Sequence, residues 1–222
     1  MDDSEPSTNP STGTAPPRRP RDPARTKRDI LLAARAEFVE YGLEGARVDR
    51  IAERAGANKR MLYHYIGNKE ALYARVLHDA YHDIRSGEHD LQLATLPPRL
   101  AMEKLVGFTF DHFRANPWFI RLLSTENIQR GAFVRTIPDI RALNSPLVSE
   151  VAEVLAAGEA EGIFRPGVDP LQLYITLTGV SYFYLSNIHT LSVVFDRPLD
   201  SDTGMDRRRA HAIEVVLGYL RP

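Results

Sequence analysis

The most informative segment of the sequence is residues 48–73, VDRIAERAGANKRMLYHYIGNKEALY. Apolar residues recur at helical spacing on both sides of Gly56, which predicts two short helices, near 48–55 and 59–66, joined by a tight turn. Asn58 is placed to cap the second helix, because an asparagine side chain accepts a hydrogen bond from the first amides of a helix. Two short helices joined in this way are typical of a helix-turn-helix unit, whose second helix enters the DNA major groove.

A long helix is predicted to follow this unit. Gly67 ends the preceding helix, Asn68 caps the new one, and Lys69 falls in its first turn. A cation in the first turn opposes the helix dipole, so local stability disfavours it. The placement is explained if the lysine and the helix amides bind one DNA phosphate together.

The rest of the chain is also predicted to be helical, and the fold class is all-α. The first helix begins at Asp22-Pro23, or alternatively at Thr26, and ends at Gly42. Further helices are expected near residues 69–87, 98–115, 117–130, 146–161, 170–190 and 206–220. No segment alternates with period two, so a sheet is not expected.

Composition narrows the function classes. The chain has 222 residues, of which 43% are hydrophobic, and it contains no cysteine, which excludes disulfides and thiolate chemistry. No apolar run reaches the ~20 residues of a membrane helix, and the start lacks the apolar core of a secretory signal. We therefore expect a cytoplasmic protein with no membrane partner.

Charge is unevenly distributed. The formal net charge is -1, yet residues 15–70 hold 13 lysines and arginines against 8 acids, a distribution typical of a segment that meets phosphates. Residues 1–21 are rich in Ser, Thr and Pro and are expected to be disordered. This tail ends in three arginines that could add to DNA affinity: Arg18, Arg19 and Arg21.

Residues 26–73 resemble the DNA-binding domain of the TetR family. The matching motifs, in order, are F-x-x-x-G, I-A-x-x-A-G, L-Y-x-Y and G-N-K-E-x-L. The resemblance implies a ligand-responsive transcriptional regulator, not an enzyme: a homodimer bound to the two half-sites of a near-palindromic double-stranded operator, and a repressor that a small-molecule effector releases. It divides the chain into the tail, a helix-turn-helix domain at 22–68 and an effector-binding and dimerisation domain at 69–222, expected to be a helical bundle.

The resemblance also assigns DNA contacts. Tyr63 and Lys69 correspond to phosphate contacts, whereas Arg60, Met61 and His64 are candidates for touching bases, since arginine reads guanine and methionine packs on a thymine methyl. Lys59 completes the set on the recognition helix. Two positions depart from the family pattern: Arg47 stands where a Ser or Thr cap is usual, so that cap is weaker or the arginine contacts phosphate, and Ile66 replaces a common Phe.

Less can be said about the effector site. Residues 108–131 and 161–170 look similar to the branch of the family that includes the pyrimidine-utilisation repressor, which does not transfer a ligand. The candidate effector contacts are aromatic and polar residues of the C-terminal region: Phe113, Trp118, Glu126, Asn127, Arg130, Tyr174 and Tyr182. For any one of the aromatic members, ordinary core is the favoured alternative. Glu126 and Arg130 stand at i and i+4 on one helix, as either an internal salt bridge or a ligand contact.

Two segments are predicted to dimerise. Residues 170–190 are apolar nearly all round, and 206–220 carry a second apolar stripe, so with their symmetry mates they would form a four-helix interface that includes Ser181. An effector wedged between 108–130 and 170–190 would tilt the long helix that begins at Lys69.

Two other function classes compete with this reading. His78, His82 and His89 could share a metal, but Asp79 stands where the H-E-x-x-H motif of metalloproteases needs glutamate. A module that only binds other proteins would not need the basic recognition helix. We find no P-loop, nucleophile elbow or G-x-G-x-x-G motif, and nothing that calls for a cofactor or a metal.

Overall fold

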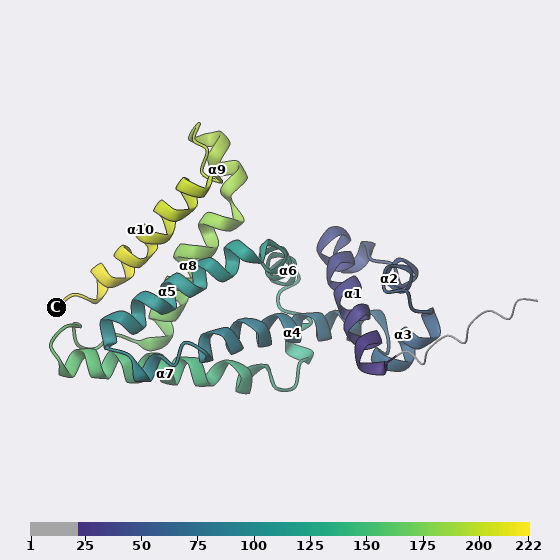
Figure 1. Ribbon diagram of the computed structural model, residues 1–222, viewed down its shortest axis with the longest axis horizontal. Coiled ribbons are helices and arrows are strands. Elements are labelled where there is room, and N and C mark those ends of the chain that lie inside the picture. The colour runs from purple at the N-terminus through teal and green to yellow at the C-terminus, as the bar shows by residue number, and fades with distance from the viewer. Residues whose placement is uncertain (1–21) are drawn as a thin grey trace, which may run out of the picture.

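A computed structural model describes residues 22–222, and the expected disordered tail with Arg18, Arg19 and Arg21 lies outside the described residues. Within them the chain forms ten α-helices and two short 3-10 segments, with no β-strand, as expected (Figure 1). The helices are α1 (Pro23–Gly45), α2 (Val48–Arg54), α3 (Lys59–Ile66), α4 (Lys69–His89), α5 (Pro98–Ala115), α6 (Pro117–Ile128), α7 (Ile140–Ala160), α8 (Pro170–Ser186), α9 (Ile188–Val194) and α10 (Asp202–Leu220). The 3-10 segments are η1 (Leu93–Thr95) and η2 (Val134–Thr136).

Helices α1, α2 and α3 form one end of the elongated molecule (right in Figure 1). Their contact surface is apolar and fully buried at Ile30, Ile51 and Leu62. The predicted capping residue Asp22 accepts a hydrogen bond from the Ala24 amide at 3.0 Å. Gly42 interrupts α1 with a φ of 66°, a left-handed conformation that favours glycine, so the predicted stop is a break near the end of the helix.

Helix α4 runs from this end into the rest of the molecule, where it packs against α7 and α5 (Figure 1). Its first half packs on α1. A second apolar core fills the space between α5, α7, α8 and α10, with Leu105, Val151, Leu177 and Val216 at most 1% exposed. One continuous helix therefore joins the helix-turn-helix unit to the bundle.

Three helix boundaries differ from the sequence expectation. Helix α6 ends at Ile128, because Arg130 and Gly131 both adopt positive φ. Helix α7 begins at Ile140 and contains Pro146, which the sequence had suggested as a start. The segment 170–190 is two helices, broken at Asn187, whose amide closes α8 on the Phe183 carbonyl.

The outward face of α8 is not the expected one. Ser181 is fully buried within the protomer, and its hydroxyl donates to the Leu177 carbonyl at 3.2 Å. Most of the apolar stripe of α10 is likewise used inside the protomer, at Val216, Leu217 and Leu220. The sequence periodicity was ambiguous here because both helices are apolar on more than one side.

A different set of residues is exposed on these helices. Leu171, Ile175 and Phe183 of α8 are 48%, 54% and 59% exposed and recur at multiples of four residues. Val215 and Tyr219 of α10 are 39% and 45% exposed. None of the helices in residues 22–222 has the length and apolar character needed to cross a lipid bilayer.

Candidate DNA interface and effector pocket

Helix α3 presents a basic and aromatic surface. Leu62 anchors it in the core, whereas Arg60 and His64 are exposed and Tyr63 is 48% exposed. Asn58 caps the helix as predicted, its side-chain oxygen accepting from the Met61 amide at 2.8 Å. Asn58 therefore fixes the first turn of the element that carries these side chains.

The candidate Met61 and its neighbour Tyr65 lie closer to the core. Met61 is half-buried. Tyr65 is also half-buried and packs against the apolar cluster of the helix-turn-helix unit. Tyr65 is therefore a packing residue, and Tyr63 is the more exposed of the two tyrosines of α3.

Lys59 is partly engaged by its own protein. Its ammonium lies 2.7 Å from the Asp49 carboxylate of α2, and this hydrogen bond raises the pKa of Lys59. Both side chains are more than half exposed, so the pair contributes little to stability. Asp49 competes with any phosphate for Lys59, a contact that the sequence did not reveal.

The start of α4 has the predicted form. The Asn68 side chain accepts from the Ala71 amide at 2.8 Å, and Lys69 is half-buried in the first turn, with Glu70 beside it. The start of α4 thus offers helix amides and one cation together. This combination suits a phosphate oxygen.

Arg47 stands where the family usually has a capping side chain for α2, and a buried carboxylate takes part of that role. Its exposed side chain makes no capping bond to α2. Instead, the Arg47 amide donates to Glu37 Oε1 at 3.0 Å. The guanidinium is available to solvent or to a phosphate.

Glu37 is a structural residue that the sequence analysis missed. It is fully buried on α1, and its carboxylate pairs with Arg50 and lies 3.9 Å from Arg54, both on α2. Burial opposes ionisation, but the hydrogen bonds from Arg50 and from the Arg47 amide outweigh it, so the pKa of Glu37 lies below its usual value. An available signal was its position on the apolar stripe of the first helix, seven residues after Ile30.

We expect the Glu37→Gln variant to unfold more easily than the unmodified protein, by about 2 kcal/mol at pH 7, because hydrogen bonds to a buried charge are lost. Chemical denaturation measures the difference. A lowered folded pKa gives stability that is present above the usual carboxyl pKa and is lost as pH falls through the folded value. The difference between the two proteins should therefore shrink in acid.

The matched control is Glu40→Gln, which removes a carboxylate that is 53% exposed on the same helix. Little change is expected from it. Equal losses in the two variants would contradict the structural role assigned to Glu37.

Two of the aromatic effector candidates, Phe113 and Tyr182, belong to a core layer between α5, α6 and α8. The Phe113 ring stacks on Phe119, with centroids 5.8 Å apart, and meets Tyr182 edge-on at the same distance. The Tyr182 hydroxyl shares a hydrogen bond with Ser124 at 2.7 Å. Phe113 is buried and Tyr182 half-buried, so they match the core alternative.

The expected pairing of Glu126 with Arg130 is wrong. Glu126 is buried, and its Oε1 accepts from the backbone amides of Phe133 and Val134 at 2.8 and 3.0 Å. Arg130 follows the end of α6 with a φ of 58° and is exposed, so it has left the face that carries Glu126. The carboxylate holds the turn after α6 in place of a salt bridge.

Asn127 and Trp118 are also separated from each other. Asn127 is exposed, and its amide donates to the Leu123 carbonyl at 2.9 Å. Trp118 is half-buried beneath the guanidinium of Arg35, 4.1 Å from its ring centroid. It lines a pocket of about 340 Å³ between α1, α4 and α6. The structure therefore does not gather the seven candidates at one place.

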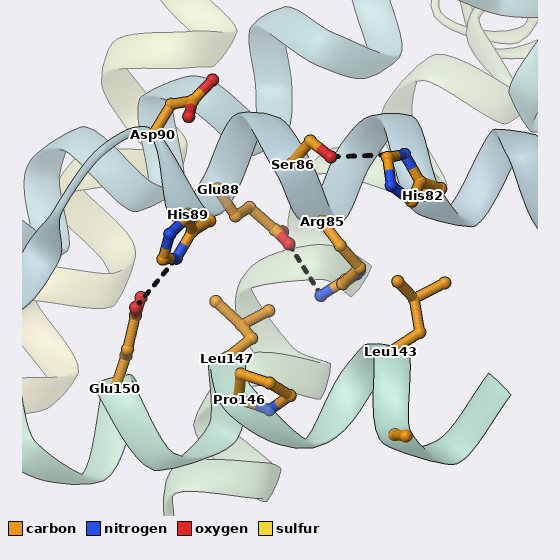
Figure 2. A pocket seen from close by; sticks show the side chains of 11 residues that line it. His82, Arg85, Ser86, Glu88, His89, Asp90, Leu143, Pro146, Leu147 and Glu150 are labelled. Atoms are coloured by element: carbon orange, nitrogen blue, oxygen red, sulfur yellow. Dashed lines mark hydrogen bonds and ion pairs between the residues drawn. The ribbon is translucent and has the colours of Figure 1, made fainter. Parts of the chain in front are cut away.

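A pocket of about 400 Å³, here called the α4–α7 pocket, lies between those two helices (Figure 2). Its central lining comes from Arg85 and Glu88 of α4 and from Leu143, Pro146 and Leu147 of α7. Figure 2 shows the two charged side chains on one side and the apolar ones facing them from below.

Tyr174 joins this pocket to α8. Its hydroxyl accepts from Arg85 Nη2 and donates to Glu88 Oε1 at 3.3 Å, while Arg85 Nη1 lies 2.7 Å from Glu88 Oε2. Arg85 also lies over the Tyr174 ring, 5.1 Å from its centroid. Of the predicted effector residues, Tyr174 is thus the one that contacts the charged groups of the α4–α7 pocket. Arg85 and Glu88 were missed because they stand in an otherwise polar helix segment.

Burial dominates the protonation of two nearby groups. It raises the pKa of Glu88 to about 7, against the opposing effects of Arg85 and Tyr174. Burial lowers the pKa of His112 of α5, so this imidazole is neutral at pH 7. In both groups, burial disfavours the charged form.

The three histidines considered for a metal have separate partners. His78 contacts Asp79, His82 contacts Ser86, and His89 lies 3.6 Å from Glu150. Across residues 22–222 no group of three potential ligands is placed to hold a metal ion.

Comparison with known proteins agrees with this geometry. Residues 30–76 match the family of bacterial regulatory proteins of the tetR type, and residues 98–216 match a tetracyclin repressor-like C-terminal domain. The chain is 36% identical over 168 residues to the transcriptional repressor NicS of Pseudomonas putida, covering 76% of this chain and 79% of NicS.

A distant relative spans nearly the whole chain. RutR of Escherichia coli K12 is 24% identical over 214 residues, covering 92% of this chain and 95% of RutR. Among solved structures, the transcriptional regulator SCO4942 of Streptomyces coelicolor superposes with a TM-score of 0.64 at 27% identity, covering 89% of this chain and 99% of that one. These matches confirm the resemblance drawn from residues 26–73 and extend it to the C-terminal helices.

Proposed function

The chain belongs to the TetR family of DNA-binding transcriptional regulators, which are not enzymes, and we propose that it is a homodimeric repressor. A small molecule releases this repressor from a near-palindromic operator. Its relative NicS is a repressor by name. The cytoplasm, where bacterial DNA is found, is its proposed location.

The observation that carries the proposal is the surface of α3 and the start of α4. Exposed Arg60, Tyr63 and His64 project from a capped helix, and Lys69 stands at the next helix start. We assign Arg60, Met61 and His64 to bases and Tyr63, Lys69 and Arg47 to phosphates. Lys59 joins the phosphate contacts when it leaves Asp49.

The proposed dimer uses the exposed apolar face of α8 and α10. Leu171, Ile175 and Phe183 form a stripe along α8, and Val215 and Tyr219 of α10 extend it. Water contact with these exposed apolar side chains is unfavourable, and a second copy related by a twofold axis would cover them. Each protomer then presents one α3, and the pair meets major grooves about 34–36 Å apart or a small multiple of this.

Helix α4 couples the two functions in this proposal. It carries Lys69 at one end and the α4–α7 pocket near the other. A ligand that binds more tightly when α4 is tilted shifts the protein toward the tilted state and so lowers its DNA affinity. The size of this effect is set by the difference in ligand affinity between the two states. A tilt of α4 moves α3 in both protomers, so that neither recognition helix fits its half-site.

The test uses the DNA immediately upstream of the gene for this chain, since regulators of this kind commonly control themselves. We expect tight, sequence-specific binding that weakens steeply as salt rises, because phosphate contacts release counterions. Gel shift against scrambled DNA of equal length measures it. Equal affinity for both fragments, or no salt dependence, would overturn the proposal.

A further inference from the structure

Arg85 is a buried cation with unused donors at the wall of the α4–α7 pocket. Its side chain is 11% exposed, and the hydrogen bond to Tyr174 and the ion pair with Glu88 each occupy one terminal nitrogen. Its Nε is buried and has no hydrogen-bond partner within residues 22–222. Such an unpaired donor is costly in a protein interior, and an arginine edge suits the two oxygens of a carboxylate.

The rest of the pocket selects for a compact, partly apolar molecule. Leu143, Pro146 and Leu147 form the wall opposite Arg85 (Figure 2). A volume of about 400 Å³ lies in the range of small-ligand sites. The pocket thus pairs one cationic anchor with an apolar wall, the combination that binds an organic acid.

Apart from Glu88, the acidic residues of the lining do not pair with this anchor. Glu150, on α7, lies 3.6 Å from His89. Asp90 is exposed just beyond the end of α4. Glu88 is the one carboxylate that faces Arg85 directly.

Resting on the proposed repressor function, we propose that the effector is a small monocarboxylate with a short apolar body, held in the α4–α7 pocket by the Arg85 guanidinium. A rotation of this group turns its unpaired Nε edge to the ligand oxygens. The apolar body packs on Leu143, Pro146 and Leu147. Tyr174 keeps its contact with the other edge of the guanidinium.

Binding is coupled to a proton on Glu88. Its pKa is raised to about 7 by burial and by Glu150, while Arg85 and Tyr174 act in the opposite direction. A second carboxylate beside Arg85 disfavours ionised Glu88, so the ligand binds to the protonated form and raises this pKa further. Affinity therefore rises as pH falls, and protonated Glu88 donates a hydrogen bond to the ligand.

The experiment titrates the full-length protein with hexanoate and benzoate by calorimetry. Hexanamide and benzamide are the neutral controls, and hexylamine and benzylamine are the cationic ones. We expect at least one carboxylate to bind at least tenfold more tightly than its amide and amine. Its affinity should rise at least threefold from pH 8 to pH 6. If neither carboxylate binds, or if the matching amide or amine binds equally well, the proposal is overturned.

Variants identify the site. Arg85→Gln should lose carboxylate affinity at least tenfold, whereas Arg99→Gln, on the exposed side of α5, should not change it. Glu88→Gln should retain binding, since its amide still donates to the ligand, and should lose the pH dependence. Unchanged affinity in Arg85→Gln would overturn the assignment. If Arg85→Gln does not fold, the Glu88→Gln variant tests the site. An unaltered dependence of carboxylate affinity on pH in this variant would refute the site.

Failure of this inference can be separated from failure of the repressor function. The same preparations are tested for binding to the DNA upstream of the gene, with and without hexanoate or benzoate. Specific DNA binding without carboxylate binding refutes the ligand class alone. Absence of specific DNA binding refutes the proposed function. Release of DNA by the carboxylate that binds is the result that supports both.

Discussion

Replacing Phe183 with aspartate is expected to leave a folded monomer and to weaken operator binding more than 100-fold. Phe183 is 59% exposed on α8, so the protomer core does not depend on it. In the proposed dimer it is covered by a partner, and each protomer would bury an unpaired charge, which is strongly unfavourable. A monomer offers one recognition helix and loses the joint binding of two half-sites. Sedimentation and gel shift measure the two effects.

The matched control is Ile128→Asp, which places the same charge on a residue that is 83% exposed at the end of α6. It should remain dimeric and bind DNA normally. A dimeric Phe183→Asp protein with normal DNA affinity would place the interface elsewhere. Ser181, which the sequence placed in the interface, is not a suitable position for this test, because it is buried and a charged substitution there would disrupt the protomer itself.

Replacing Arg60 with alanine is expected to weaken specific DNA binding by about 1–3 kcal/mol, roughly 5- to 150-fold, and to relax the preference at one base position. The exposed guanidinium on α3 can form two hydrogen bonds with a guanine edge. Affinity for a set of operator fragments with single base changes measures both effects.

Contacts with phosphate should behave differently. Tyr63→Phe and Lys69→Ala are expected to weaken binding to specific and random DNA alike, because phosphates carry no sequence information. Arg99→Ala, on α5, is the control that removes an exposed arginine remote from α3. If Arg60→Ala also weakened all sequences equally, it would be a phosphate contact and the assignment to a base would be wrong.

Local signals were sufficient for the helix-turn-helix unit. Asn58 and Asn68 cap the helices that they were predicted to cap, and Ile51 and Leu62 are buried. Capping and helical periodicity depend on residues three or four positions apart, so they can be read from a single sequence. The all-α fold was predictable for the same reason.

Helix faces in the C-terminal bundle were harder to predict. Residues 170–186 are apolar in nearly every direction, so the sequence did not show that Ser181 points inward and Phe183 outward. Glu126 and Arg130 have the spacing of a helical pair, but the helix ends between them. Its end is set by the turn that Glu126 itself holds through two backbone amides.

Local sequence signals indicated the helix-turn-helix unit, its two asparagine caps and the candidate residues for DNA contact. Only the tertiary structure brought Arg85 and Glu88 of α4 to Tyr174, which is 89 and 86 residues away. It also joined Glu37 to Arg50 across the helix-turn-helix unit. Such pairs form where packing excludes water and each charge must find a partner, and which partners meet is decided by how the helices pack, not by their spacing along the chain.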